Sequence, residues 1–351
     1  MTHLHLLIPA LLLPASAALL PSPPPHLPAF GVLFGRGEHR VEPGMVVEHW
    51  IAARFGATPP GAAPLAALAL LGSGGDPGSM AWLRADPVHL HPHGTTLTLV
   101  RSRDTGLSQP ESIALCASLN ELFESDGLRF RSFPEAPDDW YLALEQVPAL
   151  LTQPVTAVRG LSVDHWLPIG EDARAWQRRM TEAQMVLHDH PVNDAREAAG
   201  LLPVNSLWLW GEGRLGAPLP SPFAAIVADE PSTRGFALHA GVSARPVPNG
   251  LNVLMQDLTP GQTLVRLDRL ADAKTLGDPE TIDAILHALD TLWIAPALAA
   301  LRGGRIARVT VTAVDRHRTV SVTATRSNLR RFWRRPLTLA ALATRSGSPD
   351  D

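Results

Sequence analysis

The most constraining feature of this sequence is a short apolar run in its second half that ends in glycines. Residues 204–210 include two tryptophans, and Gly211 and Gly213 close the run. A polar segment with helical spacing precedes it and stops at Gly200, and Pro203 lies in the turn between them. The pattern predicts a helix, a tight turn and then a buried strand, a succession typical of folds that combine helices with a sheet.

A second apolar run, residues 4–11, predicts a strand that is buried on both faces, as in a parallel sheet. A secretory signal is not favoured, because no Lys or Arg precedes the run and the first basic residue is Arg36. Pro9 and Pro14 interrupt the apolar stretch, which is also short for a membrane span. We therefore expect a cytoplasmic protein without a membrane contact.

Between these runs the hydrophobic period changes, which indicates an inserted module. Residues 81–100 predict two strands around a turn, 111–124 predict an amphipathic helix capped by Ser108, and 128–144 predict an antiparallel pair. We predict an α/β fold with a mostly parallel sheet and helices on both faces, interrupted by this α+β module. The expected boundaries are 1–75 and 166–335 for the core, 76–165 for the module and 336–351 for a flexible tail.

Composition excludes several classes of protein. The chain has 351 residues, of which 45% are hydrophobic and 18% are charged, as in globular proteins. Its net charge of −4 provides no broad basic field, so nucleic-acid binding is not expected. The single cysteine, Cys116, excludes an internal disulfide and a cysteine-based zinc site.

The C-terminal third predicts a late helix followed by a pair of strands. An apolar stripe begins after Glu280, and Pro296 should end or kink that helix. Residues 307–313 alternate apolar and polar side chains and predict a half-exposed strand, with a return strand over 320–324. Two further short strands are predicted over 251–255 and 263–267.

Residues 190–213 carry a specific composite motif. It joins His-Pro-Val-Asn, an arginine, a glycine, a Pro-x-Asn turn and a Trp-Leu-Trp-Gly-x-Gly run; its members are His190, Pro191, Val192, Asn193, Arg196, Gly200, Pro203, Asn205, Leu207, Trp208, Leu209, Trp210, Gly211 and Gly213. This motif resembles one in the archaeal-type, cofactor-independent phosphoglycerate mutases of the alkaline phosphatase superfamily, and the resemblance implies an alkaline-phosphatase-like sheet. Residues 82–86 and 130–142 resemble two further strands of that family. The chain is also similar to the bacterial RpfE-type regulatory protein family.

The resemblance implies a phosphotransfer site from which this chain departs. In that superfamily two divalent metals clamp the phosphoryl oxygens and activate a Ser or Thr nucleophile. Here the first strand continues through residues 8–10 without the family's Asp-Gly, and the nucleophile position falls near residues 47–48, Val-Glu. Residues 251–280 contain no counterpart of the family's Asp-x-x-x-His segment. Asp315 and His317, separated by an arginine, remain as weak metal candidates.

Several polar residues are candidates for a ligand contact. The resemblance places Asn193, Arg196 and Asn205 on the substrate side, where Arg196 could bind a carboxylate or phosphate. The plainer interpretation pairs Arg196 with an acid on its own helix and lets Asn205 cap a turn. The full set of ligand candidates is Arg84, Asn193, Arg196, Asn205 and Arg214.

Two other clusters also have a plainer interpretation. His89, His91 and His93 alternate along a predicted strand and could hold zinc, although the following turn signals favour an exposed loop. Residues 326–335 combine five arginines with two aromatics and could touch nucleic acid or an acidic partner. Such arginines are more typical of a solvated face over an anchored hydrophobic pair.

From these departures we expect a non-catalytic, phosphoglycerate mutase-like protein that serves in regulation or binding. We expect no cofactor, and a partner that is an unknown protein or a small anionic ligand. The alternative is a metal-dependent phosphoglycerate mutase or phosphatase with a rewired site that uses Mn, Mg or Zn through Asp315, His317 and Asp290. A third possibility is a structural protein that docks through residues 326–351.

Overall fold

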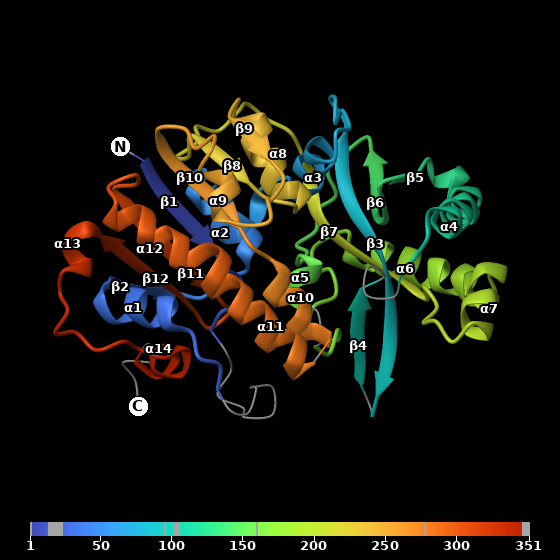
Figure 1. The fold of residues 1–351 in the computed structure, drawn as a ribbon. Helices are drawn as coiled ribbons and strands as arrows, with labels where there is room; N and C mark the ends of the chain where they lie inside the picture. Colours follow the sequence, from blue (N-terminus) through green and yellow to red (C-terminus); the bar gives the residue numbers. More distant parts are fainter. Residues whose placement is uncertain are drawn as a thin grey trace. The chain divides into compact units, whose positions relative to one another are not determined.

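The computed structural model describes residues 2–12, 24–94, 96–101, 106–158, 161–276 and 278–345. The chain forms two compact units (Figure 1): unit 1 contains residues 1–56 and 218–351, and unit 2 contains residues 57–217. Unit 2 extends beyond the predicted module of residues 76–165 at both ends. Unit 2 is larger because the strand that carries the Trp-Leu-Trp-Gly run pairs with the first strand of the module.

Unit 1 is built on a seven-stranded sheet, whose order is β2 (Glu38–Pro43), β12 (Arg318–Thr325), β11 (Arg308–Val314), β1 (Thr2–Leu7), β10 (Gly261–Arg266), β8 (Ala225–Val227) and β9 (Ser243–Arg245). Strands β11 to β9 are parallel, whereas β12 and β2 are antiparallel. The N-terminal strand lies between β10 and β11, and its Leu4 and Leu6 are fully buried. These pairings confirm the predicted α/β class and the mostly parallel sheet.

An apolar core covers one face of this sheet. Leu4 and Leu6 of β1 pack with residues of helices α1 (Pro28–Arg36), α11 (Pro279–Leu289), α12 (Ala295–Arg302) and α14 (Leu339–Arg345). The prediction of a flexible tail from 336 is wrong up to Arg345, because α14 buries Leu339 and Leu342 in this core. Residues 346–351 lie outside the described residues.

The late helix does not end at Pro296. It runs from Pro279 to Arg302 as α11, the π-helical turn η5 (Asp290–Ile294) and α12. The π turn places Pro296 in the first turn of α12, where its missing N–H costs least. Among the described residues this is the one helix long and apolar enough to cross a membrane, but half of its apolar window is buried, as in a core helix.

The opposite face of the sheet carries a ladder of polar side chains. His5 Nε2 lies 2.8 Å from Thr312 Oγ1, which lies 2.8 Å from Ser321 Oγ on the next strand. His3 Nε2 lies 2.9 Å from Thr310 Oγ1 one step along. Strand β11 was predicted to be half-exposed, but it is buried beyond its first residue because these neighbours satisfy its hydroxyls.

The remaining helices of unit 1 are α2 (Val47–Arg54), α8 (Pro231–His239), α9 (Leu251–Leu254), α10 (Arg269–Leu276) and α13 (Arg326–Leu329). The predicted strand over 251–255 is wrong, since α9 forms there and buries Leu251 and Leu254 at helical spacing. The strand expected over 263–267 is confirmed as most of β10.

Unit 2 contains a five-stranded antiparallel sheet around the long strand β3 (Ala81–His93). Strand β3 pairs with β4 (Thr96–Arg101), β6 (Ala136–Leu144) and β7 (Ser206–Arg214), and β6 pairs with β5 (Arg129–Phe133). The helices of this unit are η2 (Pro60–Ala62), α3 (Leu65–Gly72), α4 (Gln109–Leu122), η4 (Glu124–Asp126), α5 (Val155–Val158), α6 (Ala173–His188) and α7 (Pro191–Ala198). The predicted cap of α4 is confirmed, because Ser108 and Glu111 form a capping box.

The glycines that close the tryptophan run have a packing reason. Gly211 has a φ of +74°, and a Cβ there would meet the backbone nitrogen of Ala66 at 2.9 Å. A Cβ on Gly213 would lie 2.7 Å from the side chain of Pro64. The two glycines therefore let α3 and the residue before it pack directly on β7, while Trp208 and Trp210 are buried.

Candidate functional site

The carboxyl end of the central strands of unit 1 holds a buried arginine surrounded by acids. Arg266 is the last residue of β10, and its side chain is only 2% exposed. Its Nη2 donates to Glu48 at 3.0 Å, its Nη1 to Glu230 at 3.0 Å, and its Nε to Asp268 at 2.9 Å. Thr233 accepts a further bond from Nη1 at 2.9 Å. Each guanidinium nitrogen is thus bound within the protein.

The three carboxylates come from segments that are far apart in the sequence. Glu48 lies in the first turn of α2, Glu230 caps α8 directly after β8, and Asp268 follows β10 by two residues. Glu230 also accepts bonds from the backbone nitrogens of Ser232 and Thr233. The carboxyl edge of a parallel sheet is the usual place for a ligand site, and here that edge is closed by an ion cluster.

Burial and charge act in opposite directions on these groups. Burial raises the pKa of Asp268 to about 6, although Arg266 acts to lower it. Burial also acts to raise the pKa of Glu230, but Arg266 and the donors of α8 bring it below its usual value. Burial alone would lower the pKa of Arg266, yet its acidic neighbours raise it well above the usual range. The guanidinium therefore stays charged and is the shared counter-charge of the three acids.

These residues do not fit the two-metal centre that the family resemblance implies. A divalent ion needs open carboxylate or imidazole donors, whereas a fixed positive charge occupies the space between these acids. No group of three or more His, Cys, Asp or Glu among the described residues is arranged to hold a metal. Glu48 lies close to the position expected for the nucleophile, and its carboxylate forms an ion pair with Arg266.

Sequence reasoning missed this cluster. The segment 251–280 lacks an Asp-x-x-x-His pattern, as predicted, but it carries Asp268 and Asp272 four residues apart. The available signal was Arg266 itself, a charged residue inside an apolar strand.

The residues of the rewired-site alternative serve separate local structures. Asp315 lies in the turn between β11 and β12, where its Oδ1 accepts the backbone N–H of the exposed His317 at 2.9 Å. Asp290 is buried in the π turn and accepts the N–H groups of Ala29 and Phe30, so it caps the start of α1. The described contacts therefore do not bring these three candidates together.

Arg84 is buried at the centre of a polar cluster in unit 2. It donates through Nε to Asp86 at 2.7 Å and through Nη1 to the Tyr141 hydroxyl at 2.8 Å, and its Nη2 bonds to Asp139. Its guanidinium carbon lies 4.7 Å from the Tyr141 ring centre and 5.5 Å from that of Trp210. These contacts give Arg84 a structural role, and a ligand contact for it stays a prediction.

Asn193 and Arg196 hold α7 to its surroundings. The Asn193 amide donates to Leu187 and Val204 and accepts from the Val204 nitrogen. The Arg196 side chain, 1% exposed, bonds to Glu111 at 3.0 and 3.1 Å. The plainer interpretation was right that Arg196 pairs with an acid, but that acid belongs to α4 and not to its own helix.

Asn205 directly precedes the tryptophan strand β7, and Arg214 is the last residue of that strand. The Asn205 amide bonds to both the nitrogen and the carbonyl of Leu90, so it extends the pairing of β7 with β3 by one step. It does not cap a turn, because the bonds cross to another strand. Arg214 is exposed and donates to the Glu145 carbonyl at 2.7 Å. None of these described contacts groups the five ligand candidates around one opening.

The histidine candidates lie on a regular part of β3. His89 and His91 have ring centres 5.8 Å apart, and His89 Nδ1 lies 2.9 Å from the Pro203 carbonyl. The predicted exposed loop is wrong for this stretch, since it pairs with β4. The side chain of His93 lies outside the described residues.

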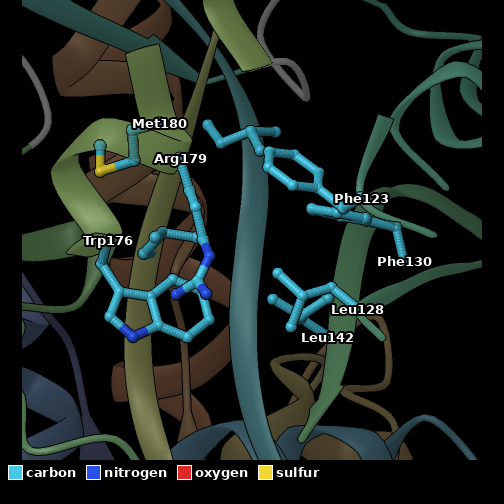
Figure 2. Close-up of a pocket in the computed structure, with 9 residues that line it drawn as sticks. Phe123, Leu128, Phe130, Leu142, Trp176, Arg179 and Met180 are labelled. Atoms are coloured by element: carbon cyan, nitrogen blue, oxygen red, sulfur yellow. The ribbon is translucent and has the colours of Figure 1, made fainter. Parts of the chain in front are cut away.

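A small apolar hollow lies between α6 and the sheet of unit 2 (Figure 2). Its lining is apolar apart from Arg179, whose guanidinium lies 4.9 Å from the ring centre of Trp176. The space inside the hollow that the centre of a water molecule can occupy measures about 10 Å³. Binding pockets for small molecules measure roughly 300–1,000 Å³, so this hollow is too small to count as a ligand site.

Comparison with known sequences finds relatives of part of the chain. Residues 57–193 match the family model described as 2,3-bisphosphoglycerate-independent phosphoglycerate mutase. A protein of that name from Methanothrix thermoacetophila is 41% identical over 64 residues, which cover 18% of this chain and 15% of the relative. A second, numbered 2, from Methanothermobacter thermautotrophicus is 28% identical over 155 residues, 42% of this chain and 38% of the relative. The matches thus span well under half of these relatives.

Two solved structures align with most of the chain. The PH0037 protein of Pyrococcus horikoshii aligns with a TM-score of 0.56 and 14% identity, over 92% of this chain and 87% of that one. The cofactor-independent phosphoglycerate mutase of Thermoplasma acidophilum aligns with a TM-score of 0.49 and 20% identity, over 99% and 95%. The alignment with the PH0037 protein supports the α/β fold that the sequence predicts.

The family match lies entirely inside unit 2, which holds the Arg84 cluster. The Arg266 cluster lies in unit 1, outside the matched residues. The family model and the curated relatives therefore show that part of this chain is similar to phosphoglycerate mutases.

Proposed function

We propose that this chain is a non-catalytic, phosphoglycerate mutase-like protein that works by binding, in the manner of an RpfE-type regulatory protein of the bacterial cytoplasm. Its partner is a protein or a small anionic ligand, and it needs no cofactor. The observation that carries the proposal is the Arg266 cluster, in which a guanidinium holds three carboxylates at the carboxyl edge of the sheet.

The chemistry of phosphoryl transfer supports this proposal. A mutase of this superfamily must hold a phosphoryl group against a nucleophile and neutralise its charge with metal ions. Glu48 cannot replace a Ser or Thr hydroxyl as the phosphoryl acceptor here, because its carboxylate is buried and bonded to Arg266. At the end of β1, residues 8–10 offer no acid that could ligate a metal. The three carboxylates of the cluster are already bonded to the guanidinium, so they are not open donors for a divalent cation.

The alternative remains a metal-dependent mutase or phosphatase with a rewired site. That function would need donors gathered around one opening. Asp290 caps the start of α1, and Asp315 accepts a backbone bond within the β11–β12 turn. These contacts favour the non-catalytic proposal.

Conversion of 3-phosphoglycerate to 2-phosphoglycerate by the purified chain tests the proposal directly. The assay is run with Mn²⁺, Mg²⁺, Zn²⁺ or Co²⁺, with and without a chelator, and with hydrolysis of a phosphate ester as a second readout. We expect no turnover above background under any metal. Turnover that the chelator abolishes would overturn the proposal, and an Arg266→Met variant would then show whether the activity depends on this edge of the sheet.

A further inference from the structure

Residues 326–335, which we call the arginine-aromatic turn, present two large aromatic side chains to solvent. Phe332 is 79% exposed and Trp333 is 68% exposed. Their ring centres are 5.4 Å apart, and the rings meet edge to face. The sequence predicted an anchored hydrophobic pair under a solvated face, and that prediction is wrong for both rings. Two adjacent exposed aromatics normally mark an interaction surface.

The turn is held in place at both of its ends. Before the aromatics, Thr325 and Asn328 form a capping box, and Arg36 donates to the Leu329 carbonyl at 2.8 Å. After them, the Leu337 nitrogen donates to the Gly31 carbonyl at 3.1 Å on α1. Figure 1 shows this stretch joining α13 to α14. The backbone therefore fixes the aromatics outward, so that docking would cost little ordering of the chain.

Charge surrounds the aromatic pair on both sides. The turn contains Arg326, Arg330, Arg331, Arg334 and Arg335, and no acid occurs from 326 to 345. Four of these arginines are exposed, and Arg331 lies 3.8 Å from Glu38. The chain as a whole carries −4, so this is a local basic patch on an acidic protein.

We propose that the arginine-aromatic turn docks on an anionic phospholipid surface. Trp and Phe partition to the headgroup level of a bilayer, and each Arg close to an anionic leaflet adds attraction to it. The absence of a membrane contact was expected from the lack of a spanning segment, but a peripheral contact needs none. The docking rests on this patch alone and is independent of whether the chain is catalytic.

The geometry favours lipid over the other acidic surfaces. A protein partner buries roughly 800 Å² on each side of an interface, which a ten-residue turn does not supply. Single-stranded nucleic acid binds grooves where successive bases stack on open ring faces, whereas one ring here meets the other edge to face. A bilayer needs neither a large complementary surface nor a groove, because its headgroups rearrange around inserted side chains.

Co-sedimentation of the full chain with vesicles tests the proposal. We expect binding to vesicles of equal parts phosphatidylglycerol and phosphatidylcholine, little binding to phosphatidylcholine alone, and weaker binding as salt rises. Arg334→Glu with Arg335→Glu should lower the binding about tenfold or more, and Phe332→Ser with Trp333→Ser should lower it several-fold. The matched controls in unit 1 are Arg302→Glu with Arg305→Glu, and Leu292→Ser, all exposed in the described structure.

Near-ultraviolet circular dichroism checks that each variant folds, and all of the substituted side chains are exposed. Equal binding to both kinds of vesicle, or equal losses in the control variants, would overturn the proposal. Binding of a labelled single-stranded oligonucleotide that exceeds vesicle binding and is lost in the same variants would also overturn it, and would assign the turn to nucleic acid.

Discussion

Two buried arginines, one in each unit, use the same chemistry for different structural ends. Arg84 bonds to two carboxylates and a tyrosine that lie on its own strand and on the neighbouring β6. Arg266 bonds to three carboxylates brought by α2, α8 and the segment after β10. The Arg84 cluster fastens two paired strands, whereas the Arg266 cluster closes the edge where several parallel strands end.

The two clusters also differ in their relation to the family match. Unit 2 retains sequence similarity to the mutases, and its buried polar residues are engaged in holding strands and helices together. Unit 1 lies outside the family match, and the guanidinium of Arg266 occupies the carboxyl edge of its sheet. A similarity in unit 2 therefore says little about chemistry at the edge of unit 1.

The largest effect is expected for Arg266→Met. This substitution leaves three acids beside one another without a counter-charge, and breaking a buried ion pair costs about 3–5 kcal/mol. Arg266 lowers the pKa of Asp268, which is already about 6, so its loss raises that pKa further. Asp268 then protonates as the pH falls, and the cost should shrink between pH 7 and pH 5.

Urea unfolding of the variant at the two pH values measures this cost. Arg269→Met, a substitution of the exposed neighbour on α10, is the control and should stay within about 0.5 kcal/mol of the parent. A loss below about 1 kcal/mol for Arg266→Met, or one that grows as the pH falls, would contradict the assigned role of the cluster.

Arg84→Met should cost somewhat less, about 2–4 kcal/mol, because two acids and not three lose their partner. Replacing Asp139 by Leu in the same chain should restore part of that loss, since it removes one unpaired charge. Thermal unfolding of the single and double variants checks this, with Arg129→Met on the exposed face of β5 as the control. An additive loss in the double variant would show that Arg84 and Asp139 are not coupled.

Much of the fold could be predicted from the sequence because the spacing of apolar residues along a run distinguishes a helix from a strand. The N-terminal strand, the tryptophan strand and the α4 cap follow from such local patterns. Pro296 was predicted to end or kink the late helix, but the helix continues, because a π turn over Asp290–Ile294 leaves Pro296 in the first turn of α12. Strand β11 was misread because its threonines alternate like exposed residues, while histidines on β1 bond to them.

From the sequence, the candidate site could be predicted only as a departure from the site that the family resemblance implies. The sequence predicts that residues 8–10 and 47–48 lack the acid and the nucleophile that the resemblance implies, because such predictions concern single positions. It does not show that Glu48, Glu230 and Asp268 meet at Arg266, because that depends on three connections across a parallel sheet. The ligand candidates came from the resemblance alone, and their contacts within the described part of the chain are with other protein groups.

Asn193→Ala sharpens the structural interpretation of unit 2. The change leaves the carbonyls of Leu187 and Val204 and the nitrogen of Val204 without this partner in a buried setting, which should cost about 2 kcal/mol. Glu197→Ala, an exposed change on the same helix, should cost a few tenths of that amount. Urea unfolding compares the two variants, and equal stabilities would show that Asn193 is free to serve a ligand.

The smallest expected effect is a loss of the stability of unit 1 as the pH falls. Burial, with His3 and Arg54 close by, lowers the pKa of His5 to about 3 from an ordinary value of 6.5. A group with a lowered pKa contributes stability above its unfolded value and loses it as the pH falls, so unit 1 should lose roughly 1–2 kcal/mol from this group between pH 6.5 and pH 5. His5→Gln, which keeps a polar group beside Thr312 but does not titrate, should flatten that slope, whereas exposed His26→Gln should leave it unchanged. Tryptophan fluorescence during urea unfolding at both pH values measures the slope, and the same slope in the parent and in His5→Gln would mean that the neutral form of His5 is not what the ladder across β1, β11 and β12 requires.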